Sequence, residues 1–174
     1  MASKKDLLIF GHGYSAAALA ARLIDSGWSV TGTTRSEERA KAIAATGVSP
    51  LVWPGSDISD VLANASHLLI SAGPNEAGDP VLNELSAEIG RASFEWVGYL
   101  STIGVYGNHD GAWVDEDTPL TPSTRRGELR VAAETAWQDL AKKADWPLQI
   151  FRIAGIYGPG RGPFRRCAQV QRAG

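Results

Sequence analysis

The fold is decided by the stretch Asp6-Leu7-Leu8-Ile9-Phe10-Gly11-His12-Gly13-Tyr14-Ser15-Ala16, which leads into the alanine-rich segment Ala17-Ala18-Leu19-Ala20-Ala21-Arg22-Leu23. An apolar run of strand length breaks into a glycine turn, and an amphipathic segment follows at once. Strand, turn and helix in this order are the setting in which a G-x-G-x-x-G/A pattern indicates a loop that binds a dinucleotide. The alternative is a glycine turn with a purely structural role.

The small residues of this loop each have a physical reason. Gly11 permits the tight turn, Gly13 lets the backbone approach a pyrophosphate, and Ala16 lets the helix pack closely on the strand. The start of the helix then directs free N–H groups and a positive dipole end at the phosphates. Tyr14 and Ser15 lie in the same loop, and we expect Tyr14 to cover the cofactor rather than to take part in chemistry.

The composition is that of an ordinary globular protein. With 174 residues and a formal net charge of −2, the chain fits one domain and gives no global sign of binding nucleic acid or an anionic membrane. Cys167 is the single cysteine, so no internal disulfide can form, and the first residues lack the apolar segment of a signal peptide. No apolar run approaches the roughly 20 residues of a membrane span. These features predict a cytoplasmic protein without a nucleic-acid or membrane partner.

Strand-like and helix-like segments alternate along the chain. Strands are expected at residues 6–10, 28–34, 48–53, 67–72, 95–101 and 146–153. Helices are expected at residues 17–23, 36–45, 57–63, 79–91 and 128–144. This alternation predicts an α/β fold: a Rossmann-type, doubly wound parallel sheet of about six strands with helices on both faces. A ligand would lie at the carboxyl ends of the strands.

The end of the chain looks unfinished. We expect a dinucleotide-binding domain over residues 1–158 and a basic tail over 159–174, the start of a missing or vestigial substrate-binding part. The arginines at 165, 166 and 172 could contact a phosphate or simply lie on a solvated helix face. If the sixth strand is the last, one edge of the sheet is uncovered.

The end of the second strand distinguishes between two dinucleotides. An NAD site usually has an acidic residue there for the ribose hydroxyls, whereas an NADP site offers an arginine to the 2′-phosphate. Here the chain has Thr34, Arg35 and Ser36, with no acid until Glu37, and Arg39 follows a turn later. Arg35 can make a bidentate contact, to which the hydroxyls add donors. The sequence therefore favours NADP, with NAD possible; the alternative is a solvent-facing arginine.

Three further stretches carry a family resemblance. They are Leu100-Ser101-Thr102-Ile103-Gly104-Val105-Tyr106-Gly107, then Asp115-Glu116 with Pro119, then Phe151-Arg152-Ile153-Ala154-Gly155-Ile156-Tyr157-Gly158-Pro159-Gly160. With the glycine loop, and in this order, they resemble the extended short-chain dehydrogenase/reductase superfamily, the group of NAD-dependent epimerases and dehydratases. Residues 30–36 look especially like its atypical, YeeZ-like subgroup.

The resemblance implies roles for particular residues. Thr102 matches the hydroxyl residue that binds a substrate carbonyl or alcohol oxygen at the end of the fifth strand. Residues 158–160 would lie near the nicotinamide, and helices 79–91 and 128–144 would form the face of a homodimer. The residues that would line the cofactor beside the fourth strand are Ser71, Ala72 and Gly73.

The sequence departs from the family at the catalytic pair, Tyr-x-x-x-Lys. By register those two positions fall on Arg126 and Arg130. A guanidinium stays protonated at working pH and is a poor proton shuttle. Arg130 could still bind the ribose or a phosphate, and Arg126 could bind an anionic substrate or polarise a carbonyl. The YeeZ-like subgroup lacks this tyrosine, so the departure agrees with the subgroup and weakens the case for activity.

Other candidate side chains are interpreted as structural. Tyr106 and Tyr157 belong to strand-end motifs and are expected to pack. The histidines at 12, 67 and 109 are scattered without metal-ligand spacing, so no metal site is expected.

Two functions are consistent with these features. The first is an NADP-linked oxidoreductase or epimerase that acts on a small carbonyl or sugar-nucleotide-like substrate. Hydride would pass between the nicotinamide and a substrate carbon held by Thr102, with charge stabilised by Arg126. The second is a non-catalytic module that binds the dinucleotide as a sensor or scaffold.

Overall fold

The computed structural model describes residues 5–162. The arginines and the cysteine expected in the basic tail beyond residue 162 lie outside the described residues. Within them the chain forms one six-stranded parallel sheet, in the order β3-β2-β1-β4-β5-β6. This is the doubly wound Rossmann order, so the predicted fold class is confirmed.

The strands and helices alternate as the sequence predicts. The strands are β1 (Asp6–Phe10), β2 (Ser29–Thr34), β3 (Ser49–Val52), β4 (His67–Ile70), β5 (Trp96–Thr102) and β6 (Leu148–Ile153). The helices are α1 (Tyr14–Asp25), α2 (Glu37–Ala44), α3 (Ser59–Asn64), α4 (Pro80–Ile89) and α5 (Arg125–Ala144), with a 3₁₀ turn, η1 (Ile103–Val105), after β5.

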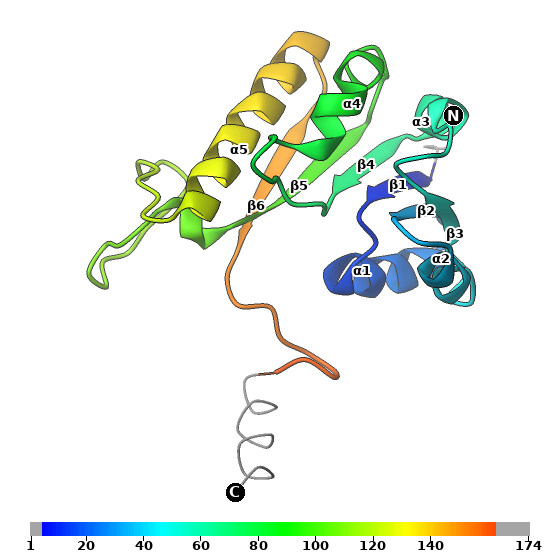
Figure 1. The fold of residues 1–174 in the computed structure, drawn as a ribbon, viewed down its shortest axis with the longest axis horizontal. Helices are drawn as coiled ribbons and strands as arrows, with labels where there is room; N and C mark the ends of the chain where they lie inside the picture. The colour runs from blue at the N-terminus through cyan, green and yellow to red at the C-terminus, as the bar shows by residue number, and fades with distance from the viewer. Residues whose placement is uncertain (1–4, 163–174) are drawn as a thin grey trace, which may run out of the picture.

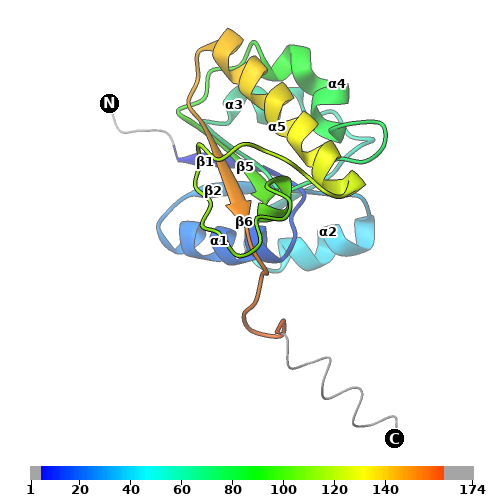
Figure 2. The same ribbon diagram turned by 90° about the vertical axis from the view of Figure 1, so that its left-hand side faces the viewer.

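Helices cover both faces of the sheet. In Figures 1 and 2, α1 and α2 lie on one face, whereas α3, α4 and α5 lie on the other. Successive residues of β1 point to opposite faces. Leu7 and Ile9 pack with Ala16 and Ala20 of α1, and Leu8 and Phe10 belong to the larger core. That core includes Tyr99 of β5 and Trp137 of α5, both fully buried.

Several element boundaries differ from the sequence prediction by one to three residues, and two of them have a clear physical cause. The long helix begins at Arg125 rather than at residue 128, because Thr124 caps it by accepting a hydrogen bond from Gly127 N at 3.1 Å. Arg126 and Arg130 therefore both lie on α5. The last strand begins at Leu148 rather than at residue 146, because Pro147 has no N–H to donate to a sheet.

Within residues 5–162 the sheet ends at β3 on one side and at β6 on the other. Strand β6 pairs with β5 alone, and Phe151 on β6 is 41% exposed. No helix among the described residues is long and apolar enough to cross a bilayer.

Candidate functional site

A cleft of about 850 Å³ opens at the carboxyl ends of the strands. It lies where the strand order reverses between β1 and β4, the place where doubly wound sheets bind ligands. Eight of the predicted cofactor residues line it: Gly11, Gly13, Thr34, Arg35, Ser36, Ser71, Ala72 and Gly73. Three others lie beside it in the first turn of α1: Tyr14, Ser15 and Ala16.

The conformation of the glycine turn depends on the backbone of Gly11 and Gly13. Gly11 has a φ of +86°, and a Cβ there would lie 2.9 Å from Ala72 N, so the turn is pressed against the end of β4. Gly11 N also donates to Thr33 Oγ1 at 2.9 Å. At Gly13, by contrast, a Cβ would meet only Gly11 O at 3.9 Å. The space beside Gly13 is therefore open to a ligand.

The start of α1 presents unused donors to the cleft. Gly13 is its N-cap, and no side chain caps it. The other helices of eight or more residues within the described chain each have a side-chain cap, from Ser36, Asp79 or Thr124. Ala16 is fully buried, which is the close packing that its size predicts. An uncapped helix start beside an open glycine turn fits an anionic group such as a pyrophosphate.

Tyr14 faces the segment that follows β6. Its hydroxyl donates to Pro159 O at 3.1 Å, and the Arg161 guanidinium lies 5.4 Å from its ring centroid. The tyrosine thus joins the glycine loop to residues 158–161, which the sequence could not indicate. That it covers a cofactor stays a prediction.

Two arginines lie at the end of β2. Arg35 and Arg39 both line the cleft, together with Ser36, whose Oγ accepts from Arg39 N at 3.3 Å. Arg39 also directs Nη2 to His12 O, at 3.5 Å. This wall of the cleft therefore carries two positive charges.

His12 lines the same cleft and is only 7% exposed. Its Nε2 is buried without a hydrogen-bond partner among the described residues. Burial lowers the pKa of His12, and the nearby Arg39 lowers it further against a backbone hydrogen bond that raises it. Sequence reasoning treated this histidine as structural. The available signal was Gly32, because a glycine inside a strand often marks a close approach.

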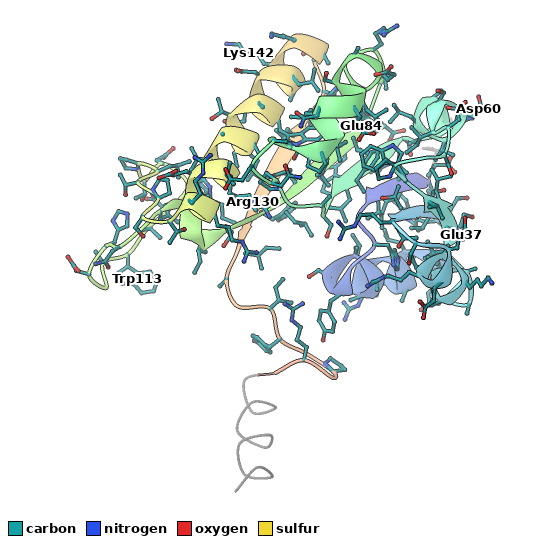
Figure 3. All side chains as sticks on the ribbon, viewed as in Figure 1. Glu37, Asp60, Glu84, Trp113, Arg130 and Lys142 are labelled. Carbon is teal, nitrogen blue, oxygen red and sulfur yellow. The ribbon has the colours of Figure 1, made fainter. Side chains whose placement is uncertain are left out.

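The predicted catalytic residues gather at the end of β5 and the start of α5. Thr102 Oγ1 accepts from Gly104 N at 3.2 Å. A Cβ on Gly127 would lie 2.9 Å from Gly104 O, so η1 packs closely against the first turn of α5. Arg126 is exposed on that turn. Figure 3 shows Arg130 on the side of α5 that faces the sheet, whereas Trp113 lies at the end of the projecting loop.

Arg130 connects this region to the cleft. Its Nη1 donates to Leu100 O at 2.7 Å and to the Tyr99 hydroxyl at 3.2 Å. Its Nη2 packs against Gly73, a residue of the cleft wall: a Cβ added at Gly73 would lie only 2.9 Å from this nitrogen. Its Nε is buried and has no hydrogen-bond partner in the part of the chain that the structure describes. The guanidinium thus has donors beside the cleft.

The tyrosine that Arg130 contacts cannot replace the family's acid/base residue. Tyr99 is fully buried, and this burial raises its pKa to about 12, although the Arg130 charge opposes the rise. A phenol with this pKa holds its proton at neutral pH and is poorly matched to proton transfer there.

A buried polar network lies behind Thr102 and was missed by sequence reasoning. Ser101 donates to Glu134, which is 1% exposed and pairs with Arg152 Nη2 at 2.9 Å. Arg152 Nη1 donates to the Tyr106 hydroxyl at 2.9 Å. Burial lowers the pKa of Arg152, but its bonds to Glu134 and Tyr106 raise it overall, so the guanidinium stays charged. Tyr106, expected to pack, also anchors Arg152.

Comparisons with known proteins agree with this architecture. No family model matches the chain. Protein YeeZ of Escherichia coli (strain K12) is 28% identical over 92% of this chain and 62% of its own length. A functionally unknown conserved protein from Silicibacter pomeroyi is 53% identical with a TM-score of 0.86, over 94% of this chain and 57% of that chain.

Two further solved structures are similar over most of the chain. A proposed NAD-dependent epimerase/dehydratase from Methylobacillus flagellatus is 30% identical with a TM-score of 0.70, over 98% of this chain and 61% of that one. UDP-glucuronic acid 4-epimerase from Bacillus cereus, in complex with UDP-glucuronic acid and NAD, is 21% identical with a TM-score of 0.75, over 91% of this chain and 59% of its own. At that identity the likeness shows the fold alone.

The fold and the cleft define a Rossmann protein with the dinucleotide-binding, epimerase-like architecture. The chain is similar over most of its length to YeeZ, to the Silicibacter protein and to the Methylobacillus structure, and these likenesses support an atypical short-chain dehydrogenase/reductase or epimerase superfamily. It spans about 60% of the length of these relatives.

Proposed function

We propose that the chain binds NADP in the cleft and is the nucleotide-binding part of an oxidoreductase or epimerase. This enzyme would act on a small carbonyl or sugar-nucleotide-like substrate. The observation that carries this proposal is the uncapped start of α1 behind the open glycine turn, at the reversal point of the sheet. The pyrophosphate of a dinucleotide would accept hydrogen bonds from the free N–H groups at the start of α1, and its negative charge would complement the positive end of the helix dipole. Relatives solved with NAD support a nicotinamide dinucleotide.

The end of β2 supports NADP over NAD. Arg35 and Arg39 line the cleft there, and the neighbouring Ser36 adds a hydroxyl. No acidic side chain lies among residues 33–36 to accept from ribose hydroxyls. A 2′-phosphate dianion matches two guanidinium groups, because charge-assisted hydrogen bonds are about twice as strong as neutral ones.

Residues at the end of β5 support a reaction on a substrate oxygen. The nicotinamide, when bound, supplies a hydride acceptor or donor. Thr102 would hold the substrate oxygen, and Arg126 would stabilise its developing charge. Arg130 would donate from Nη2 to a ribose hydroxyl beside Gly73. The UDP-glucuronic acid in a related structure supports a sugar-nucleotide-like substrate.

A second candidate function is a dinucleotide sensor or scaffold without chemistry. It is favoured by the two arginines, Arg126 and Arg130, at the positions of the family's tyrosine and lysine. Neither guanidinium can shuttle a proton at working pH, and the buried Tyr99 holds its own.

Calorimetric titration with NADPH and NADH tests cofactor binding. We expect tight NADPH binding that Arg35→Ala weakens by about tenfold, with NADH affinity changed less than about threefold. Arg91→Ala is the matched control, because Arg91 is an exposed arginine just after α4 whose guanidinium donates to Ala87 O. Absence of binding by either nucleotide would overturn the proposal.

Thr102→Ala separates the enzyme from the sensor. In an enzyme this variant abolishes NADPH-linked turnover of a carbonyl panel and leaves cofactor affinity unchanged; Thr102→Ser keeps the hydroxyl that caps η1 and restores turnover. Turnover that survives Thr102→Ala would contradict the role of the threonine. A wild-type chain that binds NADPH and turns over no substrate would favour the sensor.

We also propose a homodimer through α4 and α5. Both helices lie on the same face of the sheet (Figure 2), and the family resemblance supports their pairing with a second copy. Light scattering at high concentration is expected to give the mass of two chains, and a monomer would count against the proposal.

A further inference from the structure

We propose that His12 Nε2 donates a hydrogen bond to the 2′-phosphate of the bound nucleotide and so selects NADP over NAD. This inference rests on the proposed NADP binding and deepens it, because it assigns nucleotide selection to a residue of the glycine turn as well as to the end of β2.

The first observation is an unsatisfied buried atom. His12 is 7% exposed, and its Nε2 has no hydrogen-bond partner within residues 5–162. The other two histidines do have partners: His67 Nδ1 lies 2.9 Å from Ser66 Oγ, and His109 Nε2 lies 3.0 Å from Tyr106 O. Buried polar groups in native proteins are nearly always paired, and an exception needs a reason. A ligand in the cleft that His12 lines supplies one.

The second observation is the place of the ring. A Cβ on Gly32 would lie 2.7 Å from His12 Cδ2, the carbon bonded to Nε2, so this edge of the imidazole lies against β2. Only glycine at position 32 leaves that room. The ring therefore occupies the wall between the glycine turn and the end of β2, where Thr34 and Arg35 face the same cleft.

The third observation is the charge around the ring. Arg39 of α2 directs Nη2 to the His12 carbonyl at 3.5 Å, and both residues line the cleft with Arg35. Burial and the Arg39 charge lower the pKa of His12 against a backbone hydrogen bond that raises it, so the ring is neutral at pH 7 and carries one N–H, which we place on Nε2 when the phosphate is bound. Two guanidinium charges attract a phosphate dianion to this wall. A neutral N–H donor then adds a hydrogen bond without the cost of a third buried cation.

A 2′-hydroxyl gains much less from the same donor. A hydrogen bond to a charged acceptor is substantially stronger than one to a neutral acceptor. His12 should therefore affect nucleotides that carry the 2′-phosphate and leave those without it nearly unaffected.

Two probes that differ only in this group test the inference: adenosine 2′,5′-bisphosphate and adenosine 5′-monophosphate, titrated into the purified chain by calorimetry. We expect His12→Ala to lower the affinity for the bisphosphate by about tenfold or more, and the affinity for the monophosphate by less than about threefold. His12→Gln keeps an N–H donor and should retain part of the preference. His67→Gln is the matched control, a half-buried histidine at the opposite end of the strands, and should leave both affinities unchanged.

Other outcomes are equally decisive. An unchanged preference in His12→Ala, or an equal loss for both probes, overturns the inference. If His12→Ala does not fold, a His12→Gln chain with a reduced preference for the bisphosphate and unchanged affinity for the monophosphate supports it. A His12→Gln chain with the full wild-type preference, or with an equal loss for both probes, overturns it. If Arg35→Ala reduces the preference for the bisphosphate over the monophosphate and His12→Ala does not, this inference is overturned and the proposed function stands. Failure of the wild-type chain to bind either probe or NADPH would overturn the proposed function as well.

Discussion

Two regions at the carboxyl edge of the sheet are built by different means. The cleft around the glycine turn is formed mainly by backbone: Gly11 at positive φ, the open space at Gly13 and the uncapped start of α1. The region around Thr102 depends on side chains, and there the sequence predicts Arg126 and Arg130 at the positions where the family has tyrosine and lysine. A backbone-built site persists while the fold persists, whereas a side-chain-built site can change its chemistry within an unchanged fold.

The largest expected effect tests the support behind Thr102. Glu134→Ala removes the acceptor of Ser101 and leaves Arg152, whose side chain is 16% exposed, without its carboxylate. Breaking one partner of a buried pair costs about 3–5 kcal/mol, and the partial exposure of Arg152 places the loss near 3 kcal/mol. The free energy of unfolding from urea denaturation measures it.

Glu128→Ala on the same helix is the control. Its pair with Arg125 joins side chains that are 54% and 63% exposed, and such surface pairs contribute less than about 1 kcal/mol. A loss at Glu134 no larger than the loss at Glu128 would show that the network does not stabilise this region.

Gly11→Ala tests the backbone-built cleft. The new Cβ would lie 2.9 Å from Ala72 N at a φ of +86°, so the turn must move away from β4. Displacing a positioned group by about 1 Å can cost about a hundredfold, and we expect a loss of this size in NADPH affinity by calorimetry.

Gly27→Ala separates backbone strain from displacement. Gly27 has a similar φ of +80°, but a Cβ there would meet nothing within 4 Å. It should lower stability by about 1–2 kcal/mol and leave affinity unchanged. Equal affinities for the Gly11 and Gly27 variants would contradict the role of the turn.

The same contrast explains what the sequence could predict. The alternation of segments predicts the doubly wound sheet, and G-x-G-x-x-A predicts the turn, because both depend on local pattern. Glu134 and Arg152 read as ordinary charges on a helix and a strand, since only the tertiary fold brings them to Ser101. For the unsatisfied Nε2 of His12 the only sequence signal is Gly32, twenty positions along the chain, and no local pattern connects the two residues.

Two helix residues show the same limit. The sequence predicts the start of α5 three residues too late, because Thr124 is one of several hydroxyl and turn residues before the helix and nothing in the sequence singles it out as the cap. Asp79 was expected only as a helix start, yet its carboxylate also accepts from Trp137 Nε1 at 3.1 Å and so joins α4 to α5.

A smaller effect is expected where the two regions meet. Arg130→Met removes the donors beside Gly73, and we expect NADPH affinity to fall by about tenfold. Arg125→Met, one turn earlier, removes only the exposed pairs with Glu76 and Glu128 and should change affinity by less than about twofold. Thermal melts of both variants distinguish a lost ligand contact from lost support of the Tyr99 hydroxyl. An Arg130→Met chain with wild-type affinity would assign this arginine to structure alone.

The smallest expected effect is a dependence of stability on pH, to which the cleft contributes through His12. Burial lowers the pKa of both His12 and His67 below the value of about 6.5 that histidine has in an unfolded chain. Between the folded and unfolded pKa values the unfolded chain binds more protons, so the free energy of unfolding falls as the pH drops from about 7.5 towards 5.5. The carboxylate pKa values at Asp57, Glu76 and Asp115 are lowered from values near 4, so their effect on stability begins only below about pH 5, outside this window.

Urea denaturation across that window measures the dependence. His12→Gln should flatten part of it and His67→Gln another part, because burial lowers the pKa of both histidines. A stability that rises on acidification would contradict burial of the neutral ring, and with it the hydrogen-bond donor that the cleft is proposed to offer the nucleotide.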